Sequence, residues 1–267
     1  MKEGYDPNYA QRIYRAIEKK GGHKILFREL HVKGIENLRR DSGNKRLYLG
    51  NHLSNADALV IWYTFHKYRI KMPMMVAGAN LNIGLLKTAG LDFSRLGAFW
   101  ADREKIGKKN RENIAEIGEK VDKVLSDNND LLAFPEGGRS YNGKLFEKYK
   151  TGIIKKVLQR EKDIEIVPFA IDYSRRIEED FFKYLEKVKE WKFGGKQLYI
   201  ALDLLALTKE YFSKKTKEAY INFGRPTRLE KITDSPLYLL ETIQAVKGFS
   251  MGRTNELYQE IQEMKKK

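Results

Sequence analysis

The sequence predicts an α/β fold, with a largely parallel central sheet flanked by helices and a short helical extension at the N-terminus. Apolar runs with the length of strands alternate along the chain with segments whose apolar residues recur at helical spacing. The strand-like runs are apolar throughout, which is typical of parallel strands buried on both faces. We expect residues 1–28 to form the extension and residues 29–267 to form one α/β domain.

The expected elements follow one another in a regular order. The first helix is expected over 8–19, where Tyr9, Ile13, Ala16 and Ile17 share one side. Strands are expected at 47–50, 73–77, 98–101, 131–134, 164–173 and 219–223. Helices are expected at 56–67, 108–126, 152–159 and 178–190, with a basic C-terminal helix from residue 254. In such a sheet, ligands bind beyond the carboxyl ends of the strands, so polar motifs directly after strands mark a candidate site.

Composition narrows the chemistry. The chain has no cysteine, which excludes disulfides, thiolate zinc sites and a cysteine nucleophile. Its four histidines, at positions 23, 31, 52 and 66, lack the spacing of a helical metal site, so neither a metal nor a cofactor is expected. The net charge of +15 favours acidic partners such as nucleic acid, anionic lipid, coenzyme A or an acidic carrier protein. A solvated lysine-rich surface is the alternative explanation of that charge.

Targeting signals are not apparent in the sequence. The first twenty residues contain no apolar core, and no stretch approaches the ~20 apolar residues of a membrane span. We therefore expect a cytoplasmic protein that contacts the membrane peripherally, at its cytoplasmic face. Residues 181–193 (FFKYLEKVKEWKF) have the composition of an interfacial helix, although a helix packed on the sheet has the same pattern.

The first polar motif is NHLSNAD, residues 51–57, directly after the strand LYLG. If His52 lies on the turn between strand and helix, Asp57 in the first helical turn can fix its tautomer, and the other ring nitrogen accepts a proton from a hydroxyl. That hydroxyl attacks by itself, so no nucleophilic side chain is needed. The alternative is structural: Ser54 and Asp57 have the spacing of a helix capping box, with Ser54 or Asn55 as the cap and His52 as a turn residue.

The second motif is FPEGGRS, residues 134–140, directly after the strand LLAF. Two adjacent glycines, Gly137 and Gly138, let the backbone approach a ligand closely. Arg139 supplies a planar fork for phosphate oxygens, and Glu136 either orients that arginine or binds a substrate hydroxyl. An ordinary glycine turn with an exposed ion pair is the alternative.

Two further segments have weaker local signals. GAFWADRE, residues 97–104, offers Arg103 either as a second phosphate contact or as a solvated charge at a strand end. In IVPFAIDY, residues 166–173, Pro168 predicts an edge strand or a bulge. This proline either shapes an acyl groove or serves packing alone.

Taken in order, NHLSNAD, GAFWADR, FPEGGRS and IVPFAI resemble the four sequence blocks of the glycerolipid acyltransferase superfamily, across 30–180. The stretches 76–103 and 136–145 are most similar to its glycerol-3-phosphate and dihydroxyacetone-phosphate branch. The resemblance implies that His52 and Asp57 form the catalytic pair. It also implies a set of residues that bind glycerol phosphate: Arg103, Glu136, Gly137, Arg139 and Ser140.

The chain departs from the family pattern at two places. Asp102 stands where the first of two adjacent arginines is usual. Asn51 precedes the histidine, as in lysophosphatidate enzymes, whereas proline is the other residue found before the histidine in this family. These departures concern the acceptor and leave the reaction type unchanged.

The resemblance implies transfer of a fatty acyl group from acyl-CoA or acyl-carrier protein to a hydroxyl of glycerol-3-phosphate in phospholipid biosynthesis, with His52 as general base. The implied partners are the acyl donor and an anionic membrane surface, and nucleic acid is not expected. Lysophosphatidate acyl transfer is the alternative within the same chemistry. A basic nucleic-acid-binding module and a catalytically inactive membrane-binding protein are alternatives of another class, and the intact His52–Asp57 pair argues against the latter.

Overall fold

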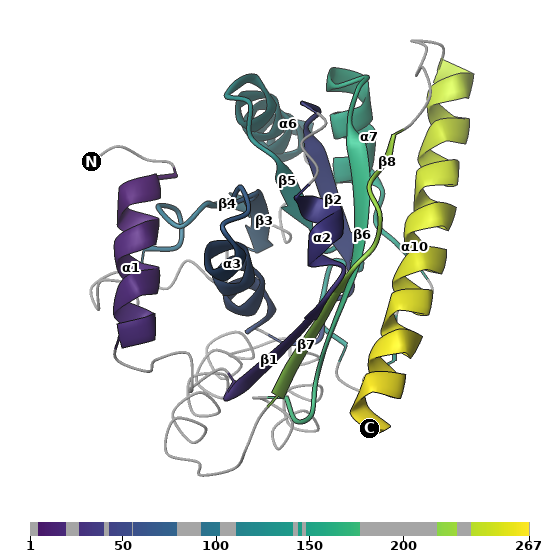
Figure 1. The fold of residues 1–267 in the computed structure, drawn as a ribbon. Coiled ribbons are helices and arrows are strands. Elements are labelled where there is room, and N and C mark those ends of the chain that lie inside the picture. The colour runs from purple at the N-terminus through teal and green to yellow at the C-terminus, as the bar shows by residue number, and fades with distance from the viewer. Residues whose placement is uncertain are drawn as a thin grey trace, which may run out of the picture.

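A computed structural model gives the fold of the chain (Figure 1). It describes residues 5–19, 27–39, 43–54, 56–78, 92–101, 111–140, 144–145, 148–176, 218–228 and 236–266. The described helices are α1 (Pro7–Lys19), α2 (Ile35–Leu38), α3 (Asp57–Tyr68), α6 (Arg111–Ser126), α7 (Gly152–Arg160) and α10 (Pro236–Lys266). The strands are β1 (Glu29–Lys33), β2 (Arg46–Gly50), β3 (Met74–Gly78), β4 (Ala98–Ala101), β5 (Leu131–Ala133), β6 (Glu165–Tyr173), β7 (Glu218–Phe223) and β8 (Thr227–Arg228).

The strands form one mixed sheet in the order β1-β7-β6-β2-β5-β3-β4, with β8 paired to β6. Strands β6, β2, β5, β3 and β4 are parallel to their neighbours within that run. Strand β7 runs antiparallel to β6, and β1 runs parallel to β7. The largely parallel sheet expected from the apolar runs is therefore confirmed, with β2 and β6 buried along their whole length.

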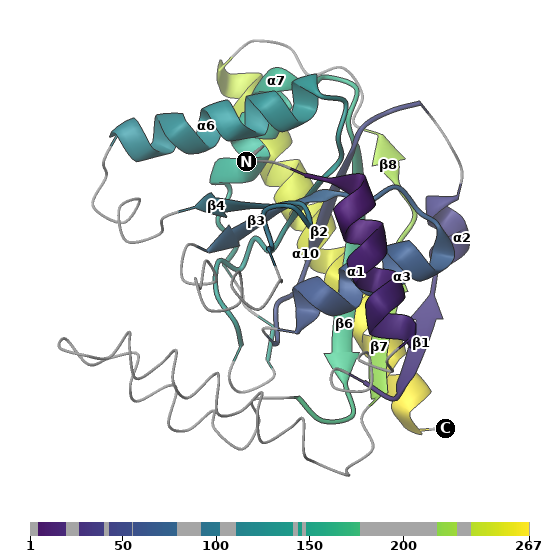
Figure 2. The same ribbon diagram turned by 90° about the vertical axis from the view of Figure 1, so that its left-hand side faces the viewer.

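Helices cover both faces of the sheet. Helices α1 and α3 share one core with the sheet, and α6, α7 and the first half of α10 share a second. Figure 1 shows these two layers on opposite sides of the strands, and Figure 2 faces the layer that contains α1 and α3. Because α1 buries Tyr9, Ala10 and Tyr14 in the first core, the N-terminal segment packs as part of the same body. The division of the chain at residue 28 stays a prediction.

Most expected elements lie within a few residues of their predicted bounds, with two differences. Helix α10 begins at Pro236 rather than near residue 254, and it packs along β6 (Figure 1). In α1, Ala16 is exposed, and Tyr14 lies on the buried face instead. The expected helix at 178–190 and the interfacial segment 181–193 lie outside the described residues. Among the helices that are described, none combines the length and apolarity needed to span a bilayer.

Pro168 does not lie on an edge strand. It lies within β6, opposite Leu49 of β2, and its carbonyl accepts a hydrogen bond from the Gly224 N–H at 2.8 Å. On that side, Ile166 pairs with Thr227 and Phe169 pairs with Phe223, so three steps along β6 face four along the partner chain. Proline has no backbone N–H to donate. It lies where the pairing with the neighbouring chain shifts by one residue, so no backbone donor is needed at this position of β6. Of the two predicted alternatives, the edge strand is wrong and the bulge is confirmed, with the extra residue on the chain that pairs with β6.

Candidate active site

The two strongest motifs leave the sheet side by side. Strands β2 and β5 are parallel neighbours, and Leu49 is in register with Ala133. The segments 51–57 and 134–140 therefore start at the same level of the carboxyl edge, as expected for a site in a parallel sheet. Gly50, the last residue of β2, lies against the Phe169 ring, and a Cβ there would come within 2.4 Å of it. The glycine at this strand end is a steric requirement of the turn that follows.

His52 and Asp57 form the pair that their spacing predicts. Nδ1 of His52 lies 2.8 Å from Oδ2 of Asp57, and the Asp57 side chain is fully buried. An ionised carboxylate only accepts hydrogen bonds, so we assign the proton to Nδ1. In the described part of the chain, no group bonds to Nε2 of His52, and 13% of the side chain remains exposed. The ring thus presents an unpaired basic nitrogen, which is the arrangement that a general base needs.

The Asp57 carboxylate also organises the turn around it. Its Oδ2 accepts the N–H groups of Leu53 at 2.7 Å and Ser54 at 3.0 Å, and its Oδ1 accepts the hydroxyl of Tyr173 at 2.6 Å. Ser54 in turn accepts the Ala56 N–H through its hydroxyl. Only half of the expected capping box forms, since Asp57 accepts the Ser54 N–H but the Ser54 hydroxyl does not accept the Asp57 N–H. The N-cap residue is Ala56, without a side-chain cap, so the prediction of Ser54 or Asn55 as the cap is wrong.

The side chain of Asn51 hydrogen-bonds to the backbone of β6. Its side-chain amide donates to the Ile171 carbonyl and accepts from the Ile171 N–H, each at 2.9 Å. The amide thus continues the β2–β6 ladder by one step where the backbone of β2 turns away. This contact ties the His52 turn to β6 and accounts for an asparagine at a position where the family also uses proline.

The FPEGGRS loop wraps the His52 turn. Oε2 of Glu136 accepts the His52 N–H at 2.8 Å, and the Ser140 N–H donates to the His52 carbonyl at 2.9 Å. Gly137 has φ +68°, and a Cβ there would lie 2.5 Å from Cδ of Lys150, so this turn requires glycine. Glu136 therefore holds the backbone of the histidine, a contact that the sequence did not predict. Its predicted role toward the substrate stays a prediction.

The structure describes some of the predicted phosphate-binding residues but not all of them. Arg139 and Ser140 are buried in the loop, at 5% and 3% exposure, and the Ser140 hydroxyl donates to the Lys144 carbonyl at 2.6 Å. Arg176, just beyond β6, donates to the Ser140 carbonyl at 3.2 Å and brings a second guanidinium to this loop. Arg103 lies outside the described residues, and β4, which precedes it, is the edge strand of the sheet.

An apolar cavity adjoins the pair. Phe134 stacks on the His52 ring, with centroids 4.4 Å apart and planes 15° apart, and it also lines a cavity of about 780 Å³. The walls come from the ends of β2 and β5 and from α6 and α7, and include Ile117, Gly118 and Ile153. Lys150, Lys155 and Lys156 lie at the same cavity. An apolar space with cations around it suits a long chain attached to an anionic carrier.

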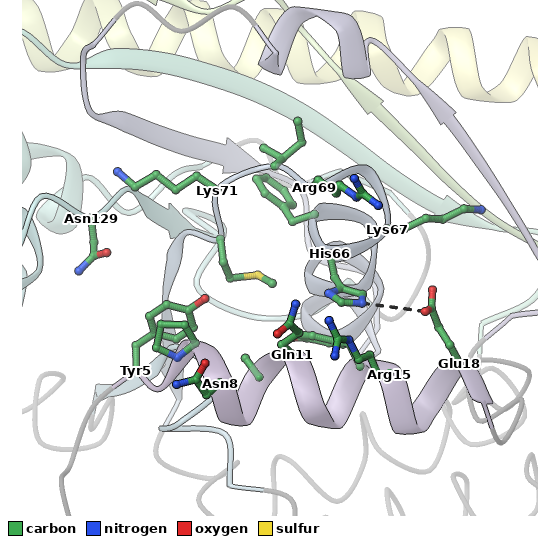
Figure 3. A pocket seen from close by; sticks show the side chains of 16 residues that line it. Tyr5, Asn8, Gln11, Arg15, Glu18, His66, Lys67, Arg69, Lys71 and Asn129 are labelled. Atoms are coloured by element: carbon green, nitrogen blue, oxygen red, sulfur yellow. Dashed lines mark ion pairs between the residues drawn. The ribbon is translucent and has the colours of Figure 1, made fainter.

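A second hollow, of about 840 Å³, lies between α1 and the C-terminal part of α3 (Figure 3). Its cations do not converge: Lys67 and Lys71 point in opposite directions, and His66 faces Glu18 at 4.0 Å. Burial lowers the pKa of His66 below its usual value; the charge of Glu18 opposes this shift and the charge of Arg15 adds to it. The hollow thus lacks the grouped charges found around the FPEGGRS loop.

Several contributors to the site escaped sequence reasoning. Tyr173, Phe134 and Arg176 carry side chains that reach the His52 turn or its loop, yet their local patterns are those of a strand end or a loop. Tyr149 belongs here too, since burial and then the charge of Glu136 raise its pKa to about 12. The one available signal was position, because Phe134 and Tyr173 stand at the carboxyl ends of predicted strands.

Comparisons with known proteins show which family the chain matches. Residues 29–172, more than half of the chain, match the family model described as Acyltransferase. The chain is 30% identical over 212 residues to a glycerol-3-phosphate acyltransferase of Shewanella woodyi and 28% identical over 230 residues to one of Alteromonas mediterranea. These alignments cover 76% and 84% of this chain but only 24% and 25% of the relatives, so the chain spans about a quarter of their length.

The fold was also compared with solved structures. The 1-acyl-sn-glycerophosphate (LPA) acyltransferase PlsC of Thermotoga maritima superposes with a TM-score of 0.49 and 17% identity, over 95% of this chain and 83% of that chain. The family match rests on the segment that carries both motifs, from β1 to Asp172 of β6. This chain belongs to the acyltransferase family.

Proposed function

We propose that this chain transfers a fatty acyl group from a thioester, acyl-CoA or acyl-carrier protein, to the primary hydroxyl of glycerol-3-phosphate. The observation that carries the proposal is the His52 ring at the carboxyl edge of the sheet, held on a buried carboxylate, with no described residue bonded to its Nε2. The acyltransferase family match supports the reaction type, and the relatives' name, glycerol-3-phosphate acyltransferase, supports this acceptor over lysophosphatidate.

In the proposed reaction, Nε2 of His52 takes the proton of the acceptor hydroxyl while the hydroxyl oxygen attacks the thioester carbonyl carbon. The new C–O bond forms, the C–S bond then breaks, and the leaving thiolate recovers the proton from the imidazolium. Asp57 stabilises the imidazolium and keeps the proton of the neutral ring on Nδ1. The products are an ester and a free thiol, and no bond to the protein forms at any step.

The acceptor phosphate is assigned to the FPEGGRS loop. Arg139 and Arg176 bring guanidinium groups to this loop, and a planar fork suits phosphate oxygens. Arg103 completes the proposed set, as the family resemblance implies. A charge-assisted hydrogen bond is worth ~1.5–3 kcal/mol, so Arg139→Ala should raise KM for the acceptor by about ten- to a hundredfold and leave KM for the donor unchanged.

The acyl chain is assigned to the apolar cavity beside Phe134. This cavity reaches the His52 ring through the Phe134 stack, and its three lysines suit the phosphates of coenzyme A or the acidic surface of a carrier protein. Ile117→Trp should fill part of the cavity and shift the preferred acyl chain toward shorter lengths. Unchanged chain-length preference in a folded variant would remove the acyl chain from this cavity.

We further place the reaction at the cytoplasmic face of a membrane, bound peripherally. The net charge of +15 favours anionic headgroups, and the first turns of α10 expose large apolar side chains: Leu237 (67%), Leu240 (54%) and Tyr238 (37%). Exposed apolar residues of this kind mark interaction surfaces. Sedimentation with anionic and neutral vesicles tests the assignment, and no pelleting with anionic vesicles at low salt would remove it.

The deciding experiment is a thiol-release assay with the purified chain. Since the protein has no cysteine, a thiol-reactive chromogen reports the liberated carrier thiol without background from the protein. His52→Ala should lower turnover ~10²–10⁴-fold, whereas the control His31→Ala, on β1 at the far edge of the sheet, should retain it. Near-native turnover in folded His52→Ala would refute the mechanism.

The same assay identifies the substrates. The ratio of kcat/KM for glycerol-3-phosphate and lysophosphatidate, with one donor, decides the acceptor, and a clear preference for lysophosphatidate would overturn our assignment alone. Acyl-CoA and acyl-carrier protein are compared at equal acceptor. The proposed reaction uses no metal or cofactor, so a chelator should leave the rate unchanged. Specific binding of nucleic acid with no acyl transfer would favour the binding-module alternative.

A further inference from the structure

Tyr173 makes a contact that the proposed chemistry has not yet used. It is the last residue of β6, its side chain is 3% exposed, and its hydroxyl donates to Oδ1 of Asp57 at 2.6 Å. The other carboxylate oxygen, Oδ2, takes the His52 ring and two N–H groups of the same turn. Oδ2 therefore binds groups of its own turn, whereas Oδ1 binds a residue 116 positions away in the sequence.

The tyrosine is itself held firmly at the strand end. Its backbone pairs with Ala219 of β7, and its carbonyl accepts the Lys265 ammonium at 2.8 Å. Lys265 also contacts the neighbouring Asp172 at 2.9 Å, which fixes the C-terminal turn of α10 on β6. On the opposite side, Asn51 joins the His52 turn to Ile171 of the same strand. The phenol thus approaches Asp57 from a rigid frame.

We propose that Tyr173 is a positioning residue, which acts through Asp57 to hold the His52 ring in its reactive orientation and tautomer. The hydroxyl fixes the plane of the carboxylate, so that Oδ2 stays directed at Nδ1 of His52. Its hydrogen bond also stabilises the negative charge of Asp57, so the His52–Asp57 pair binds an extra proton less readily. Tyr173 touches no substrate in this role. The inference rests on the proposed function of His52 as a general base.

The test compares Tyr173→Phe with the native chain and with Tyr14→Phe. Phenylalanine keeps the ring and removes only the hydroxyl. Tyr14 is a matched control, since it is 1% exposed and its hydroxyl has no hydrogen-bond partner among the described residues. Tyr173→Phe should lower kcat about ten- to a hundredfold, the usual cost of a lost outer-shell partner, with KM for both substrates unchanged. Tyr14→Phe should keep the native kcat.

Two readouts separate positioning from mere structural support. Among the described residues, the titratable groups bonded to His52 are Asp57, at the ring, and Glu136, at the backbone N–H, and Tyr173 is bonded to Asp57. Without the phenol, the His52–Asp57 pair should take up a proton more readily, so the acidic limb of the kcat/KM profile should move to higher pH. In an Asp57→Asn background, adding Tyr173→Phe should cost clearly less than it does in the native chain, because the amide has no negative charge for the phenol to stabilise.

The outcomes are distinguishable. If His52→Ala retains turnover, the proposed function fails, whatever Tyr173 does. If His52→Ala is inactive but Tyr173→Phe keeps the native kcat and acidic limb, the positioning role fails and the function stands. Additive losses in the Asp57→Asn background would also overturn the role, and this comparison holds even if Tyr173→Phe melts earlier, provided all variants are assayed below their transitions.

Discussion

Replacing Asp57 separates its structural duty from its charge. The buried carboxylate accepts four donors, from the His52 ring, the Leu53 and Ser54 N–H groups and the Tyr173 hydroxyl. Asp57→Ala leaves all four without an acceptor, at ~1–3 kcal/mol each, or ~4–12 kcal/mol together. Because whole domains are stable by only ~5–15 kcal/mol, Asp57→Ala should be severely destabilised.

Asp57→Asn should behave differently. The amide oxygen can replace Oδ2 toward His52, Leu53 and Ser54, and the amide NH₂ then faces the Tyr173 hydroxyl, whose oxygen accepts it. The turn and the histidine tautomer are kept, and only the charge is lost. Charge stabilisation of the imidazolium at 2.8 Å is worth ~1.5–4 kcal/mol, so kcat should fall about tenfold to a thousandfold.

Melting by circular dichroism and the thiol-release assay measure the two effects separately. Asp163→Asn is the control, because it removes an exposed carboxylate that pairs with Arg228. It should match the native chain in both measurements. If Asp57→Ala and Asp57→Asn have the same melting temperature, the four hydrogen bonds of Asp57 do not contribute the stability that we assign to them. If Asp57→Asn keeps native turnover, the charge of Asp57 plays no part in the reaction.

Gly137→Ala should lower the melting temperature by about 2–8 °C, because of its positive φ and the contact with Lys150; Gly138→Ala, where a Cβ meets nothing within 4 Å, is the control, and equal melting would contradict the argument. Burial raises the pKa of Asp130, so the folded state holds that proton more tightly than the unfolded chain and stability falls as pH rises above 3.8. Asp130→Asn should therefore have a higher melting temperature than the native chain at pH 7 and the same melting temperature below pH 4. A lower melting temperature of the variant at pH 7 would contradict the expected direction of the effect. Leu240→Asp should weaken sedimentation with anionic vesicles, whereas Gln244→Asp, an equal charge change at an exposed polar position of α10, should not; equal losses would point to charge alone.

The alternation of strands and helices was predictable because it depends on local periodicity. The apolar runs at β2, β5 and β6 are continuous, as strands buried on both faces require, and the motifs directly after β2 and β5 were visible as such. The His52–Asp57 contact was predictable for the same reason, since five residues of separation across a strand-to-helix turn constrain the geometry.

Elements that depend on distant packing were less predictable. The part of α10 that precedes residue 254 contains two glycines, Gly248 and Gly252, which disfavour a helix by ~1 kcal/mol each. The helix nevertheless forms from Pro236, because Ile243, Val246 and other residues of this part pack into the core of the sheet. For Pro168 the sequence allowed an edge strand or a bulge, and only the pairing of β6 with the chain beside it decided for the bulge.

The sequence by itself determined the fold class, the order of the elements and the motif that holds the proposed base, all of which follow from residues close together in the chain. Only the tertiary structure decided which strand ends meet, and hence that Glu136 binds the His52 backbone and that Tyr173 binds Asp57. These contacts join residues 84 and 116 positions apart. Hydrogen bonds at such separations are set by sheet order and register, which no local pattern of side chains specifies.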